Sequence, residues 1–157
     1  ERSLVTANIP SKVTINNVEY NVTSIGNRAF SGCANLTTIT LPSSLTSIGD
    51  YAFYGCISLS SITLPSGVTS IGDNAFYSCS SLSSITLHSS VTSIGNCAFY
   101  NCSNLSSITL PSSVTSIGNY AFFNCYNLTI YCEALSQPDS WSVDWNCSNC
   151  PVVWGHK

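Results

Sequence analysis

Three cysteines near the C-terminus have the spacing in this chain that best suits metal chemistry. Cys147 and Cys150 are separated by two residues, as in one half of a zinc site, and Cys132 and His156 could complete a set of three sulfur ligands and one nitrogen ligand. Such sites normally contain a second closely spaced ligand pair, which this segment lacks. We therefore expect no metal and no other cofactor. We interpret these cysteines as packed within the C-terminal segment, with a disulfide that involves Cys132 as the alternative.

A second group of cysteines recurs at a constant interval of 23 residues. If successive copies stack, their Cβ atoms lie about 5 Å apart and point the same way, whereas a disulfide needs about 3.5–4.5 Å and convergent bonds. We therefore expect a column of buried free thiols. The column contains Cys33, Cys56, Cys79, Cys102 and Cys125. Cys97 lies outside it, and the odd total of 9 cysteines leaves at least one unpaired or bonded to another chain.

Nucleophilic catalysis lacks a complete set of groups in this sequence. It requires a nucleophile, a base within hydrogen-bonding reach and a group that orients the base. The histidines are His88 and His156. His88 has Ser and Thr neighbours, but the repeats around it supply no carboxylate partner. We interpret His88 as an exposed turn residue or a ligand contact, and the protein as a non-enzyme.

Charge is scarce, which argues against several classes of partner. Asp, Glu, Lys and Arg make up 7% of the chain, and the basic side chains lie near its ends, at Arg2, Lys12, Arg28 and Lys157. Binding of nucleic acid or of anionic lipid needs a basic patch, so we expect neither. The sequence contains no run of 18 apolar residues, so we expect no direct membrane insertion. Because the chain opens on Glu1 rather than Met, we expect it to be part of a longer polypeptide.

The recurring cysteines and His88 belong to a repeating unit of 23 residues. Apolar and glycine columns recur in one register, and the Phe column contains Phe30, Phe53, Phe76, Phe99 and Phe122. Other columns hold Ile25, Gly26, Ala29 and Leu36 and their equivalents in later repeats. The Leu column opens LxxIxL segments, which are the strand pattern of leucine-rich repeats. One unit cannot bury these side chains alone, so the units must stack into continuous apolar ladders.

Each repeat predicts one coil of a solenoid. The LxxITL segment predicts a strand, a Pro-Ser or His-Ser turn follows, and TSIG leads into an AFxxC segment that we interpret as a short helical turn. A short oxygen-bearing residue precedes this turn, where it could cap the free amides of a helix. These residues are Asp50, Asp73, Asn96 and Asn119. The predicted fold is an α/β, right-handed leucine-rich-repeat solenoid with a parallel β-sheet on its concave face and helical turns on its convex side.

We predict a single domain over residues 1–157 with distinct ends. Residues 1–35 form an N-terminal cap and first partial coil, 36–127 form four full repeats, and 128–157 form a C-terminal cap. Alternation between Val13 and Val22 around an Asn-Asn pair predicts a hairpin in the N-terminal cap. At the other end the register breaks after Leu128. Large aromatic side chains there should cover the last coil, and they are Trp141, Trp145 and Trp154.

Two surfaces are candidates for ligand binding. Strand alternation places a set of hydroxyls on the predicted concave face, next to His88. These are Thr38, Thr40, Ser61, Thr63, Ser84, Thr86, Ser107 and Thr109. The alternative surface is an aromatic stripe that consists of Tyr54, Tyr77, Tyr100 and Phe123. Both have a purely structural explanation, because Thr suits an exposed strand and aromatic rings can pack on one another between coils.

The repeated unit SIGxxAFxxCxxLxxITLPSSV resembles the BspA-like leucine-rich repeats of bacterial and some protozoan surface proteins, over nearly the whole chain. The segments 130–134 and 150–155 are also similar to the terminal cap of members from gut Firmicutes. The resemblance implies an extracellular or cell-surface protein that adheres to host matrix proteins such as fibronectin or fibrinogen. It supplies no catalytic residues.

The sequence therefore favours a non-enzymatic protein-binding or adhesion module. A structural spacer that holds another domain away from a surface, with no ligand of its own, is the main alternative. An ice-binding function, suggested by the regular Ser-Ile-Thr array, is disfavoured by the predicted curvature of the repeats.

Overall fold

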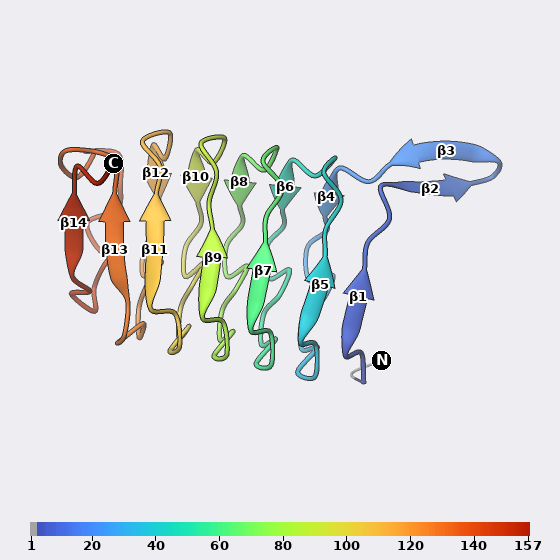
Figure 1. Ribbon diagram of the computed structural model, residues 1–157, viewed down its shortest axis with the longest axis horizontal. Coiled ribbons are helices and arrows are strands. Elements are labelled where there is room, and N and C mark those ends of the chain that lie inside the picture. The colour runs from blue at the N-terminus through green and yellow to red at the C-terminus, as the bar shows by residue number, and fades with distance from the viewer. Residues whose placement is uncertain (1–2) are drawn as a thin grey trace.

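The computed structural model describes residues 3–157 as a β-solenoid with two rows of strands, in which the coils that begin with β1 to β11 contribute to both rows and the last two strands belong to one row only (Figure 1). The first two residues of the predicted N-terminal cap lie outside the described residues. The front row is formed by β1 (Thr6–Asn8), β5 (Thr38–Thr40), β7 (Ser61–Thr63), β9 (Ser84–Thr86), β11 (Ser107–Leu110), β13 (Thr129–Cys132) and β14 (Val152–Trp154). The back row is formed by β4 (Ser24–Ile25), β6 (Ser47–Ile48), β8 (Ser70–Ile71), β10 (Ser93–Ile94) and β12 (Ser116–Ile117). All paired strands within these rows are parallel.

The predicted helical turns are wrong, because no residue in the range 3–157 is helical. The AFxxC segments instead form tight turns whose alternate amides donate to the next coil. Phe30 N donates to Ala52 O at 2.8 Å, and Gly32 N donates to Tyr54 O at 2.7 Å. An α-helix would need these amides for its own carbonyls. Residues with positive φ also interrupt any helical path in every repeat, as at Tyr51 with φ 56°.

The predicted helix caps are therefore wrong as well, and the same side chains form a ladder between coils. The Asp50 carboxylate accepts from Asp73 N at 2.9 Å, and Asp73 accepts from Asn96 N at 2.7 Å. The ladder begins at Asn27, which accepts from Asp50 N, and ends with Asn96, which accepts from Asn119 N, both at 2.9 Å. These side chains satisfy amides of the neighbouring coil, which sequence spacing alone cannot distinguish from amides of the same coil.

The core consists of the predicted apolar columns. The rings of Phe30, Phe53, Phe76, Phe99 and Phe122 stack nearly parallel, with centroids 5.3–5.5 Å apart. Phe53 to Phe122 are fully buried, as are the Ala and Cys residues that accompany them from Ala52 to Cys125. Fully burying a side chain of this size contributes about 1.5–3 kcal/mol before the loss of entropy is counted. The column interpretation of the sequence is confirmed from the second repeat on, whereas the expected burial of Cys33 is wrong, because this first-coil thiol is half-exposed.

Pairing along the two rows is unequal. The back row is hydrogen-bonded without interruption from β4 to β12, whereas the front row divides into β1–β5, β7–β9 and β11–β13–β14. The curvature of a leucine-rich-repeat sheet comes from wider helices on the opposite side. Since the described residues contain no helix, the predicted concave front face loses that physical basis.

The N-terminal coil carries a hairpin that the alternation predicted. β2 (Lys12–Ile15) pairs antiparallel with β3 (Val18–Asn21) across Asn16 and Asn17, whose positive φ values of 50° and 62° suit a type I′ turn. Every residue of both strands is exposed, and Figure 1 shows the hairpin extending away from the coils. It therefore does not cover the apolar interior, unlike the cap that we expected.

The C-terminal segment closes the opposite end. Trp145 packs edge-on against Phe122 with centroids 5.9 Å apart, and the Trp141 indole donates to Val114 O at 3.1 Å. Both tryptophans are buried, and Trp154 is half-buried beside them. The coil path continues beyond Leu128, because β13 pairs in parallel with β11 and β14 pairs in parallel with β13.

Candidate functional site

The front row presents the predicted hydroxyls to solvent. Each central strand has an exposed, buried, exposed pattern, so that Ile39 and its equivalents point into the core. The orientation of all eight Ser and Thr residues is thereby confirmed. They form two columns, one that runs through Thr38, Ser61, Ser84 and Ser107 and one that runs through Thr40, Thr63, Thr86 and Thr109. Ligand binding by these residues remains a prediction.

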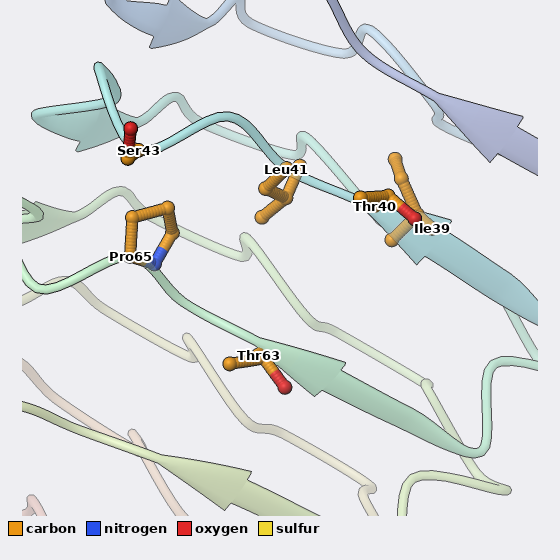
Figure 2. Close-up of a pocket in the computed structure, with 6 residues that line it drawn as sticks. All are labelled: Ile39, Thr40, Leu41, Ser43, Thr63 and Pro65. Atoms are coloured by element: carbon orange, nitrogen blue, oxygen red, sulfur yellow. The ribbon is translucent and has the colours of Figure 1, made fainter.

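A hollow opens on this face where the pairing of the front row is interrupted between β5 and β7. It has a volume of about 400 Å³, and Figure 2 shows the residues that border it. Its lining is Ile39, Thr40, Leu41, Ser43, Thr63 and Pro65. Leu41 is half-exposed here, whereas its equivalent Leu64 in the next coil is 1% exposed.

A second hollow of about 240 Å³ lies at the other interruption, between β9 and β11. Ser84, Thr86, Ser107 and Thr109 border it, together with the buried side chains beneath them. Neither hollow has a signal in the sequence, because the strand segments that flank an interrupted pair resemble those that flank a hydrogen-bonded pair.

The lining of both hollows contains no ionisable side chain. His88, in the turn that follows β9, is half-buried. Within residues 3–157 the one ion pair is Lys12–Glu19 on the hairpin, at 2.9 Å, so His88 has no carboxylate partner there. The two hollows therefore present hydroxyls and apolar carbon, with no charged side chain in their lining.

The rings of the aromatic stripe pack on one another between coils and are also partly exposed, so both interpretations of the stripe agree with the structure. Tyr54 stacks on Tyr77 with centroids 4.9 Å apart, Tyr77 stacks on Tyr100 at 4.5 Å, and Tyr100 meets Phe123 at 5.0 Å. The rings thus pack on one another between coils. They also reach solvent, since Tyr54 is 38% exposed and the other three are half-buried. Because each inner ring has neighbours on both faces, the stripe presents ring edges and phenol groups rather than open faces.

The cysteines are free thiols. In the Cys column each thiol from Cys56 to Cys125 donates to a Phe carbonyl of the preceding coil, at 3.0–3.2 Å. Burial raises the pKa of Cys56 to about 12, and the neighbouring Cys33 raises it less. Burial also raises the pKa of Cys79, Cys102 and Cys125, so these four thiols stay protonated at neutral pH and act as small buried donors.

The C-terminal cysteines are dispersed among different contacts. Cys132 is buried in β13, and burial raises its pKa to about 12. Cys150 is buried with its thiol 3.4 Å from Cys125 O, while Cys147 is half-exposed and donates to Asp144 O at 3.2 Å. Among the described residues no group of three or more His, Cys, Asp or Glu side chains could hold a metal ion.

Thiol reactivity should follow this burial. In the folded protein at pH 8 we expect an aromatic disulfide reagent to modify Cys33, Cys97 and Cys147, which are half-exposed, much faster than the six buried cysteines. In 8 M urea all 9 should react. Mass spectrometry of peptides after timed labelling would identify the sites. Rapid labelling of Cys79 or Cys102 in the native protein would contradict the burial of the column.

The repeats match a known family and several solved structures. The model of the BspA type leucine rich repeat region matches six copies over residues 3–129.

A leucine-rich repeat protein from Bacteroides ovatus is 40% identical, with a TM-score of 0.77 over 88% of this chain and 35% of that chain. A leucine rich cell surface protein from Faecalibacterium prausnitzii is 28% identical, with a TM-score of 0.78 over 99% of this chain and 48% of that chain. The pneumococcal vaccine antigen PcpA is 25% identical, with a TM-score of 0.67 over 88% and 44% of the two chains. No curated protein matches the sequence.

This chain spans less than half the length of each of these three solved chains. The family match covers most of the sequence and rests on the columns that the coils bury, so it identifies the repeat and its fold rather than a ligand. No described segment forms a helix long and apolar enough to cross a membrane. The chain belongs to the BspA-type leucine-rich repeat family.

Proposed function

We propose that this chain is a non-enzymatic protein-binding module of a bacterial surface protein and that it acts in adhesion. The observation that carries the proposal is the aromatic stripe, a half-exposed run of stacked rings with little charge around it. The similarity to a cell surface protein and to a vaccine antigen supports an extracellular location. Host matrix proteins such as fibronectin and fibrinogen are the partners to test first.

The stripe has properties that favour a protein contact. Aromatic side chains are enriched at the centres of interfaces, where they bury large areas with few rotatable bonds. Stacking on neighbouring coils already holds these rings in place, so less side-chain entropy is lost on binding. Tyr51 and Tyr120 extend the aromatic surface at its two ends, and the Arg28 guanidinium lies 4.8 Å from the Tyr51 ring centroid. The phenol groups of the stripe can hydrogen-bond to a partner without a formal charge.

Immobilised protein should bind fibronectin or fibrinogen, but not serum albumin, with affinity that changes little between low and high salt. Tyr77→Ala removes the centre of the stripe and should weaken binding at least about tenfold, whereas Tyr20→Ala, at a hairpin tyrosine that is 50% exposed and so more accessible than Tyr77, should not. Surface plasmon resonance would measure both effects, with circular dichroism as the check of folding.

The spacer alternative predicts a different result in the same experiment. If neither matrix protein binds, the spacer alternative is favoured, in which the module only separates other parts of a longer protein. If both tyrosine variants weaken binding equally, the stripe is not the specific interface.

A further inference from the structure

The two hollows of the front face overlap in their positions on the repeat, because Thr40 and Thr63 in the first correspond to Thr86 and Thr109 in the second. The first opens between β5 and β7 and the second between β9 and β11, so they are two coils apart along the same row (Figure 1). At the spacing of parallel strands, two coils correspond to about 10 Å. A ligand that occupies both must therefore be extended along the axis and must repeat at about this interval.

The chemistry of the hollows selects a neutral ligand rich in hydroxyl groups. Thr40, Thr63 and Ser43 line the rim of the first hollow, and each hydroxyl can donate and accept a hydrogen bond. No ionisable side chain lines either hollow, so a phosphate or a carboxylate ligand would be desolvated without a countercharge.

The floor of the first hollow is apolar. Leu41 and Pro65 are half-buried, and Figure 2 shows them on the two segments that border the hollow. A sugar ring matches both parts, because it has a face of C–H groups and a rim of hydroxyls. An added peptide strand fits less well. It would need the two strands to stand about 9.6 Å apart, whereas Cα atoms of β5 and β7 lie within 8 Å of each other.

An aromatic side chain continues the second hydroxyl column beyond the hollows. Tyr131 pairs with Thr109 on one side and with Val153 on the other, so it lies on the same exposed face. Its ring is half-exposed and meets the His156 ring, with centroids 4.7 Å apart. Unlike the rings of the aromatic stripe, Tyr131 has an aliphatic neighbour in the next strand, so it can offer a surface to the C–H face of a sugar. The exposure of Tyr131 on this face does not depend on the hollows.

We propose that the front face binds a neutral, extended β-1,4-linked polysaccharide, with sugar rings in the two hollows and a further ring against Tyr131. The disaccharide repeat of such a chain is close to the separation of two coils. This site differs from the aromatic stripe, so the chain has one surface for protein and another for glycan.

Affinity electrophoresis in native gels tests the proposal with a defined probe. Hydroxyethyl cellulose, a soluble neutral β-1,4-glucan, should retard the protein, whereas dextran, an α-linked glucan, and polygalacturonate, a charged polymer, should not. Thr63→Leu places a larger apolar side chain at the first hollow, and Tyr131→Ala removes the aromatic contact. Each should raise the dissociation constant at least about tenfold, and Tyr131→Phe should preserve binding.

Thr14→Leu is the control for Thr63→Leu, because Thr14 is also an exposed strand residue but lies in β2 of the hairpin, away from the front row. Retardation by hydroxyethyl cellulose that Thr63→Leu and Tyr131→Ala abolish and Thr14→Leu preserves would establish the site. No retardation, equal retardation by dextran, or equal loss in the Thr14 variant would overturn it. Tyr77→Ala should leave glycan binding unchanged, so failure of this proposal is distinguishable from failure of the protein-binding proposal.

Discussion

Replacing Gly95 by alanine should destabilise the solenoid by about 3 kcal/mol, because the added methyl group has no room. A Cβ atom at this position would lie 2.5 Å from Asp73 Oδ1, 2.6 Å from Asp73 N and 2.7 Å from Gly72 C. Two of these atoms are main chain, so a change of side-chain rotamer cannot relieve the clash. The coils must separate, and the bond from Asn96 N to Asp73 Oδ1, at 2.7 Å, is then lost.

Gly26 provides a matched control in the same column. A Cβ atom there would meet nothing within 4 Å, because no earlier coil in the described chain lies against it. Gly26→Ala should therefore change the free energy of unfolding by less than about 1 kcal/mol. Urea titrations followed by circular dichroism would compare the two variants. Equal destabilisation would show that contact between coils is not what requires glycine.

Phe76→Ala should have the second large effect, a loss of about 3–5 kcal/mol. The ring is fully buried and stacks on Phe53 and Phe99, with centroids 5.3 Å and 5.4 Å away. The neighbouring coils are tied by main-chain hydrogen bonds on several sides and cannot collapse into the space that is left. Because repeat arrays are stabilised by contacts between neighbours, the cavity also weakens coupling between the two halves of the array.

Phe30 is the natural comparison for Phe76, since it has a stacked neighbour on one side only and is half-buried. Phe30→Ala should cost clearly less than Phe76→Ala. Calorimetry should show one transition for the Phe30 variant, and a broadened or divided transition for the Phe76 variant. A Phe76 variant as stable as the Phe30 variant would refute a central role for the stack.

Much of the fold follows from the sequence because its causes are local or strictly periodic. The Asn16–Asn17 turn accepts positive φ in isolation, and the Phe and Cys columns follow once successive coils are stacked in register. The AFxxC segment misleads because a spacing of three residues suits a tight turn as well as a helix. Bonds from Phe30 N and Gly32 N to the next coil decide between the two, and they have no signature in the sequence.

The candidate site could likewise be predicted from the sequence only in part. Exposure of the hydroxyls follows from strand alternation, which acts residue by residue. The hollow beside Leu41 depends on a missing ladder between β5 and β7, although β7 and β9 are bonded and carry the same Ser-Ile-Thr sequence. Tyr131 could have been found by aligning the last strand with Ser107–Leu110, since the two share register in the structure.

The hydrogen bonds between coils also affect how such a repeat protein can evolve. Thr46, Thr69, Thr92 and Thr115 each donate to the carbonyl 23 positions earlier, and the Asp and Asn ladder keeps the same interval. Duplicating or deleting one whole unit leaves every remaining side chain with neighbours of the same kind. Slippage during DNA replication can therefore alter copy number without disturbing the packing. The length of the solenoid then differs between descendants in steps of one coil, about 4.8 Å.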